Sequence, residues 1–109
     1  MLKVIFASED AERVLFYIIA RDQGYGREIA DFWATTQTGV KRQLERFEAG
    51  GILIGKAVGR TRVYSWNPRY PFLQELRALM TRAVTFLPES ERAKLLGNRR
   101  RPRRQGKPA

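Results

Sequence analysis

Residues 25–66 read YGREIADFWATTQTGVKRQLERFEAGGILIGKAVGRTRVYSW, and this stretch decides the fold. Its first part predicts a short helix at about Arg27–Trp33, because apolar residues there recur at helical spacing. Ala34-Thr35 then makes a tight turn, and Thr36 is a suitable N-cap for a second helix that continues to about Ala49. The pattern is that of two helices joined by a short turn.

A β-hairpin is expected directly after the second helix. Gly50-Gly51 ends that helix, because two consecutive glycines make its continuation costly. Two β-like runs, Ile52–Ile54 and Arg62–Trp66, then flank a basic loop at about residues 55–62. Two helices joined by a short turn and followed by a β-hairpin form a winged helix-turn-helix. We therefore predict a mainly α fold with a small β-hairpin wing and an additional C-terminal helix.

The composition limits the possible classes of function. At 109 residues the chain has room for one domain with a modest core. It contains no cysteine and no histidine, which excludes disulfides, cysteine-based zinc or redox sites, and the commonest general base and metal ligand. The acidic residues are scattered along polar helix faces rather than gathered in one loop. We therefore expect a protein that is not an enzyme and that uses no cofactor or metal.

Hydropathy and charge indicate the kind of partner. The longest apolar stretch, Val14–Ala20, is far shorter than a bilayer span, and the N-terminus has no signal-type cleavage region. We therefore expect a cytoplasmic protein with no membrane partner. The formal net charge of +10 favours polyanions, with nucleic acid ahead of acidic membranes.

Much of this charge lies in a C-terminal tail. Residues 97–109 contain six basic residues and no acid, which gives +6, whereas the other 15 basic and 11 acidic residues give +4. We expect this tail to be disordered when free and to bind nucleic acid without reading its sequence. Residues 101–104 have some likeness to a minor-groove AT-hook, but they lack the glycine between its arginines. The tail residues expected to contact nucleic acid are Arg99, Arg100, Arg101, Arg103, Arg104 and Lys107.

A long helix is predicted before the motif, from Ser8 to about Asp22. Ser8 is a good N-cap, and the acidic residues after it favour the positive end of a helix dipole. Residues Met1–Ala7 alternate loosely and fit either a strand or a docked arm. The apolar residues that recur at helical spacing are Ala11, Val14, Leu15, Ile18 and Ile19.

The second motif helix has one apolar face and one polar face. At 100° per residue, Val40, Leu44 and Phe47 fall within a narrow arc that forms a core seam. A recognition helix reads bases mainly with its N-terminal half, and Arg, Lys, Gln and Thr all make contacts with base edges. The alternative is an ordinary solvated helix face. The candidate DNA-contacting residues of this helix are Thr36, Gln37, Thr38, Lys41, Arg42 and Arg46.

The hairpin loop is the second candidate contact. Lys56 and Arg60 lie in the loop, Arg62 follows it, and no acidic residue is near its tip. Basic side chains at such a tip suit the phosphate backbone or the minor groove. The alternative is a plain hairpin without function.

A further helix is predicted from about Pro71 to Leu87. Its apolar face is larger than three helices and a wing need, so we expect part of it to form a homodimer contact. The alternative is that the helix folds back on its own domain. We assign residues 1–88 to the domain and 89–109 to a short helical extension with the basic tail. The residues expected at the dimer interface are Leu76, Leu79, Met80 and Val84.

Two segments resemble a known superfamily. Residues 36–53, TQTGVKRQLERFEAGGIL, resemble winged-helix regulators of the ArsR/MarR-like superfamily. The continuation VGRTRVYSWNPRYPFLQELRALM is similar to a subgroup of small prokaryotic winged-helix proteins often fused to, or found beside, a minimal nucleotidyltransferase. Two positions depart from the pattern, because Ala34 stands where the turn usually has glycine and Thr35 where it usually has an apolar residue. The metal-sensing cysteines of one branch are absent.

The resemblance implies a DNA-binding function. It carries DNA contact over to Gln37, Thr38, Lys41 and Arg42 in the second motif helix, and to Arg60 and Arg62 in the wing. We therefore expect a sequence-specific, double-stranded DNA-binding transcriptional regulator. The alternative is a winged-helix protein-interaction module, an antitoxin-like partner of a separate nucleotidyltransferase.

Overall fold

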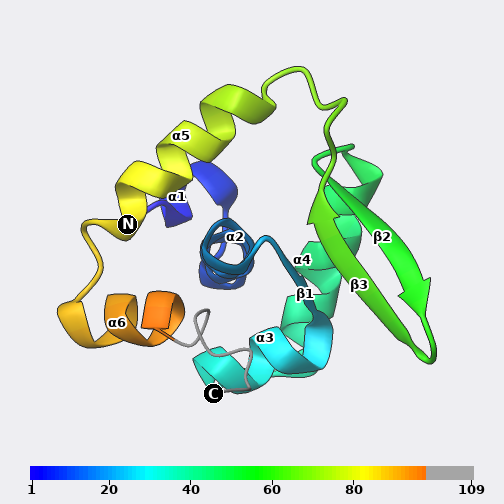
Figure 1. Cartoon of the computed structure of the whole chain (residues 1–109), viewed down its shortest axis with the longest axis horizontal. Helices are drawn as coiled ribbons and strands as arrows, with labels where there is room; N and C mark the ends of the chain where they lie inside the picture. The colour runs from blue at the N-terminus through cyan, green and yellow to red at the C-terminus, as the bar shows by residue number, and fades with distance from the viewer. Residues whose placement is uncertain (98–109) are drawn as a thin grey trace, which may run out of the picture.

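A computed structural model describes residues 1–97 of the chain. A central helix lies in the middle of the fold. Helix α2 (Glu9–Arg21) is seen end-on in Figure 1, with the other elements arranged around it. In chain order these are α1 (Lys3–Phe6), β1 (Gln23–Tyr25), α3 (Gly26–Trp33), α4 (Gln37–Ala49), β2 (Leu53–Val58), β3 (Thr61–Trp66), α5 (Leu73–Val84) and α6 (Glu89–Gly97). The molecule is thus mainly helical with a small antiparallel sheet, as the sequence predicted.

Helix α2 begins and ends where the sequence predicted. The Ser8 hydroxyl accepts a hydrogen bond from the Ala11 amide at 3.0 Å, and Asp22 ends the helix in a left-handed conformation. The predicted apolar residues of α2 are buried, with the exception of Ile19, which is partly buried. The N-terminal residues form a docked arm with one helical turn, α1, and bury Leu2.

The sheet has the strand order β1-β3-β2, and all neighbours are antiparallel. Strand β1 was not predicted, because Gly24 and Gly26 indicated only the end of the preceding helix. Gly24 pairs with Tyr64 of β3 and packs against α2, where a Cβ would lie only 2.8 Å from the Tyr17 ring. A glycine at this position therefore lets the strand approach the central helix.

The hairpin loop is shorter than predicted. Val58 pairs with Thr61, so only Gly59-Arg60 forms the turn, with φ of 62° at Gly59. A two-residue turn with glycine first at positive φ is typical of type II′ and matches the twist of the strands. The prediction of a loop over residues 55–62 is therefore wrong, and Lys56 lies in β2, paired with Val63.

The turn between α3 and α4 is tight and well bonded. Ala34 adopts a left-handed conformation with φ of 54°, and the Thr35 amide donates to the Ala30 carbonyl at 3.0 Å. Thr36 caps α4, because its hydroxyl accepts from the Gly39 amide at 3.1 Å. The predicted seam of α4 is confirmed, since Val40, Leu44 and Phe47 are all buried.

Helices α5 and α6 both pack on α2. Met80 and Val84 of α5 are buried in the core of the single chain, so their assignment to a dimer interface is wrong. Leu95 of α6 is also buried, and the Arg21 guanidinium donates to the Leu95 carbonyl at 3.2 Å. Residues up to 97 therefore belong to the same core. Within the part of the chain that the structure describes, no helix has the length and apolarity needed to cross a membrane.

Candidate functional site

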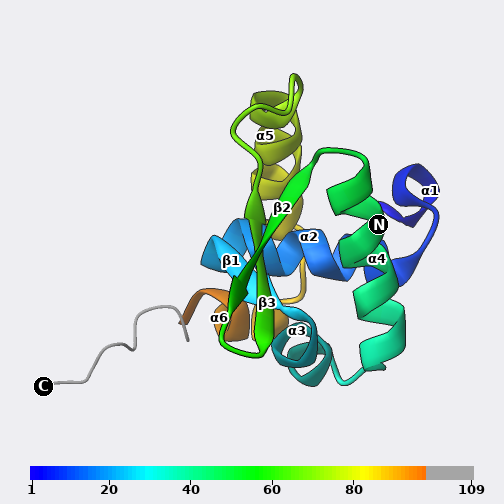
Figure 2. The same cartoon turned by 90° about the vertical axis from the view of Figure 1, so that its right-hand side faces the viewer.

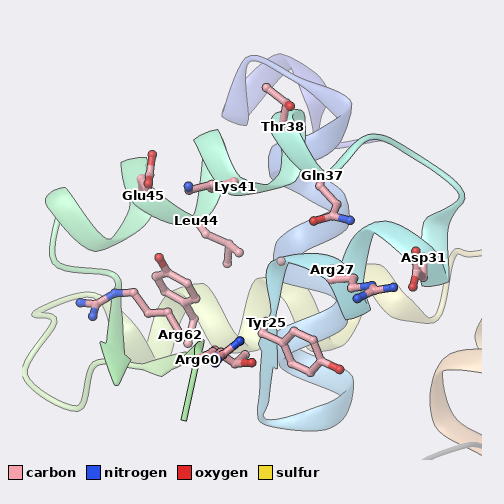
Figure 3. Close-up of a pocket in the computed structure, with 13 residues that line it drawn as sticks. Tyr25, Arg27, Asp31, Gln37, Thr38, Lys41, Leu44, Glu45, Arg60 and Arg62 are labelled. Atoms are coloured by element: carbon pink, nitrogen blue, oxygen red, sulfur yellow. The ribbon is translucent and has the colours of Figure 1, made fainter. Parts of the chain in front are cut away.

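An open groove runs between α3, α4 and the hairpin. These elements lie on the side of the molecule that faces the viewer in Figure 2. Its volume is 860 Å³, and Figure 3 shows its lining. We call it the helix–hairpin groove. It is lined by Tyr25, Gly26, Arg27, Asp31, Gln37, Thr38, Lys41, Leu44, Glu45, Arg60, Thr61, Arg62 and Tyr64.

Helix α4 forms one wall of the groove. Gln37 and Leu44 point from α4 toward Tyr25 and Arg60, whereas Thr38 points away from them (Figure 3). At 100° per residue, Gln37, Lys41 and Glu45 lie on the hairpin side of α4, and Thr38 and Arg42 lie opposite its buried seam. The helix therefore presents a groove-facing flank and, beside it, a fully outward flank.

The predicted base-reading residues are exposed and have no side-chain partners among residues 1–97. Gln37, Thr38, Lys41 and Arg42 are all exposed, and none of their side chains makes a hydrogen bond or ion pair with another described residue. Thr36 is also exposed, but its hydroxyl caps the helix. Four donor or acceptor side chains are thus available over the first turns of α4.

Arg46 has a different role from the one predicted. Its guanidinium donates to the Gln43 side chain and to the Phe6 carbonyl, both at 3.0 Å. The same group lies over the Phe47 ring, 5.0 Å from the centroid. Arg46 therefore lies on the α1 side of α4, away from the helix–hairpin groove, and it holds the C-terminal end of α1. We remove it from the candidate site.

Arg62 is also engaged within the chain. Its guanidinium donates to the Glu48 carboxylate of α4 at 2.5 Å and lies over the Tyr64 ring, 5.8 Å from the centroid. The hydrogen bond from Arg62 is the main reason why the pKa of Glu48 lies below its usual value, and the same bond raises the pKa of Arg62. The prediction that Arg62 is a free wing contact is therefore not supported.

Lys56 and Arg60 lie in different surroundings. Arg60 is at the two-residue turn and borders the groove, with its side chain near Tyr25 in Figure 3. Lys56 is exposed in β2 and is not part of the groove lining. Side chains alternate along a strand, so Lys56 lies on the sheet face opposite Gly55, the residue packed against Arg62. Of the two predicted loop cations, the structure brings Arg60 to the groove.

Eight of the residues that line the groove were not predicted as site residues: Tyr25, Gly26, Arg27, Asp31, Leu44, Glu45, Thr61 and Tyr64. Tyr25 comes from β1, and Arg27 and Asp31 come from α3, one turn apart. The spacing of Arg27 and Asp31 is a signal for a shared helix face, but the sequence does not show that this face borders a hairpin that begins more than twenty residues later. The groove is thus mixed in charge, since Asp31 and Glu45 accompany its cations.

The remaining predicted contacts lie elsewhere. Leu76 of α5 is partly buried and Leu79 is 37% exposed, so these two residues alone of the predicted interface reach the surface. The six basic tail residues, Arg99, Arg100, Arg101, Arg103, Arg104 and Lys107, lie outside the described residues.

Comparison with known proteins gives no relative for this chain. No protein-family model, no curated protein and no solved structure matches it.

Proposed function

We propose that this protein is a winged helix-turn-helix regulator that binds double-stranded DNA in a sequence-specific manner. One observation carries the proposal. Gln37, Thr38, Lys41 and Arg42 are exposed on the N-terminal half of α4, beside the hairpin turn that carries Arg60, and their side chains have no hydrogen-bond or ion-pair partner in the part of the chain that the structure describes. In this account α4 enters the major groove, and the hairpin lies along the backbone or the minor groove.

The order of the elements supports this proposal. A strand separates α2 from α3, two helices with a tight turn follow, and a hairpin comes directly after α4. The third strand in sequence is the central one, so the hairpin is attached to the body of the molecule through β1. This arrangement holds the hairpin beside the helix, as a winged reader requires.

The chemistry of α4 suits base edges. The Arg42 guanidinium and the Lys41 ammonium can donate to guanine O6 and N7, and the Gln37 amide can pair with adenine. Glu45 lies on the groove-facing flank and can accept from cytosine N4, while its charge disfavours contact with phosphate. This mixture of donors and acceptors favours contacts with bases. The general attraction to the phosphate backbone comes instead from the net charge of +10.

A protein-interaction module is the second candidate. It is favoured by three large apolar side chains on or beside α5 that remain on the surface: Phe72 is 62% exposed, Leu79 37% and Phe86 63%. Exposed apolar residues close together are typical of surfaces that meet another protein. In that account a partner, such as a separate nucleotidyltransferase, docks on α5, and α4 is a solvated face.

Two arginines of α4 provide a matched test. Arg42 and Arg46 carry the same charge one turn apart, but only Arg46 has partners within the described chain. Binding of the preferred site and of random DNA would be measured by fluorescence anisotropy for Arg42→Ala and Arg46→Ala. We expect Arg42→Ala to lose about 1–3 kcal/mol of discrimination between the two DNAs, as for a bidentate base contact. Arg46→Ala should keep its discrimination. Equal effects of the two substitutions would contradict the proposal.

A further inference from the structure

We infer that Glu48 and Arg62 form a clamp that fixes the hairpin at a set angle to α4, so that Arg62 positions the hairpin instead of contacting DNA. The consequence for DNA rests on the proposed function, whereas the clamp itself is a property of the free protein. Glu48 is on the last turn of α4, and Arg62 is the second residue of β3. The pair therefore joins the two elements that the proposed function needs to act together.

Both hairpin strands meet at the Glu48 carboxylate. Its Oε2 atom accepts the Arg62 guanidinium at 2.5 Å and the Gly55 backbone amide at 3.3 Å. One carboxylate oxygen on α4 thus bonds β2 and β3 at the same time. Beyond this point, toward the turn, the hairpin has no other hydrogen bond or ion pair to α4 among the described residues.

The packing around Gly55 shows that the clamp is closely fitted. A Cβ built on Gly55 would lie 2.5 Å from the Arg62 Nε atom and 2.9 Å from Cζ. The guanidinium therefore lies close to the β2 backbone at Gly55, where a side chain would have displaced it. Its Cζ atom also lies over the ring of Tyr64, the cross-strand partner of Gly55, 5.8 Å from the centroid. Arg62 thus extends over this pair of residues and reaches the Glu48 carboxylate.

The clamp acts on the turn that carries Arg60. The base of the hairpin is held by the buried Leu53 and Tyr64 and by the pairing of β1 with β3, but this pairing ends at Val63. Residues 56–62 therefore depend on the clamp for their angle to α4. Without it the outer part of the hairpin would open more often and would have no defined distance to the base-reading flank of α4.

Hydrogen exchange of the free protein tests the clamp without DNA. Glu48→Ala should speed amide exchange in residues 55–62 by about two- to fivefold, the size expected when an exposed ion pair and its hydrogen bond are lost. Arg62→Ala should give the same local change. Glu45→Ala is the matched control, because it removes the same charge from the same flank of α4, and Glu45 makes no hydrogen bond or ion pair to the hairpin among the described residues. Unchanged exchange in residues 55–62 of Glu48→Ala, or an equal change in Glu45→Ala, would overturn the clamp.

A double-mutant cycle tests the consequence for DNA. If Glu48 acts by positioning Arg60, the losses in DNA affinity from Glu48→Ala and Arg60→Ala should not add. Glu48→Ala alone would already move the Arg60 side chain out of place. If Arg62 is instead a phosphate contact restrained by Glu48, Glu48→Ala should tighten DNA binding and the effects should add. That result would overturn the positioning role. A protein that binds no DNA would disprove the proposed function, while the exchange measurement would still decide the clamp.

Discussion

The Asp10 carboxylate lies directly over Gly39, so closely that a Cβ at residue 39 would come within 2.3 Å of Oδ2. Asp10 belongs to the first turn of α2 and Gly39 to the first turn of α4. The contact places a negative charge at the positive end of the α4 dipole, where it is favourable. The same carboxylate accepts from the Thr35 hydroxyl at 3.3 Å, which ties the turn into the contact.

Gly39→Ala should therefore gain less stability than helix propensity predicts. Replacing glycine by alanine in a helix usually stabilises a protein by about 1 kcal/mol. At residue 39 we expect most of this gain to be cancelled, because the new Cβ moves the Asp10 carboxylate away from the start of α4 and from the Thr35 hydroxyl. Gly26→Ala in α3 is the control, since its Cβ would be 3.8 Å from the nearest side-chain atom. Urea unfolding of both variants decides it, and a Gly39→Ala protein stabilised by the full amount of about 1 kcal/mol would refute the contact.

The stabilising effect of Glu48 should depend on pH. Its pKa is below the usual 4.5 in the folded state, mainly because Arg62 donates a hydrogen bond to it. A carboxyl whose folded-state pKa is depressed stabilises the protein above its unfolded pKa and loses this effect as the pH falls through the folded value. The difference in stability between wild type and Glu48→Gln should thus be constant above about pH 5 and should shrink below it. A difference that grows on acidification would argue against an ionised Glu48.

The Tyr17 hydroxyl should ionise only at high pH. Burial is the main cause that raises its pKa to about 12, and the nearby Glu28 adds to it, although the Arg21 guanidinium lowers it. Tyr17 has its hydroxyl 3.0 Å from Arg21, the residue that binds the end of α6. Ultraviolet titration of wild type against Tyr17→Phe should show one tyrosine that ionises near 12, and its ionisation should destabilise the fold at alkaline pH. Ionisation of Tyr17 at its ordinary pKa of 10.0 would contradict the burial of its side chain.

The homodimer remains a proposal that rests on two residues. Of the predicted interface, Leu76 and Leu79 reach the surface, whereas Met80 and Val84 belong to the chain's own core. If α5 pairs with a second copy through these leucines, Leu79→Glu should convert a dimer to a monomer in light scattering. Gln74→Glu adds the same charge on the opposite side of α5 and should have no effect. A protein that is monomeric at micromolar concentration, whatever residue is at position 79, would rule the dimer out.

Helix caps and the buried face of α4 could be predicted from the sequence, because residues close together in the chain determine them. Ser8 and Thr36 are caps whose hydroxyls accept the expected amides, and the spacing of Val40, Leu44 and Phe47 gave the buried face of α4 correctly. These features depend on residues close together in the chain. They were therefore visible as patterns of residue type and spacing.

The errors concern contacts between distant segments. Strand β1 forms because Gly24 meets both Tyr17 and Tyr64, and no local pattern shows that meeting. Arg62 was expected on DNA because a basic residue beside a loop tip looks available, yet Glu48 on another element neutralises it. Met80 was placed at an interface because an apolar stripe does not show which part of it the chain itself covers.

The C-terminal tail should add affinity without discrimination. If about three of the six charges in residues 97–109 touch phosphate, each contributes about −0.9 to the slope of log affinity against log salt concentration. Deleting these residues should make the slope shallower by about three units. Salt titrations on the preferred site and on random DNA should show both weakened together. Loss of discrimination with unchanged random binding would mean that the tail reads sequence.

Selection of bound duplexes from a random DNA pool tests the central claim most directly. The wild-type protein should enrich a short shared motif, and Arg42→Ala should lose the preference at one position of that motif while keeping the others. Arg46→Ala should enrich the wild-type motif unchanged, because its guanidinium is bonded to Gln43 and Phe6. A wild-type pool that stays random, or a motif that Arg42→Ala reproduces in full, would contradict the account of α4 as a reader of base sequence.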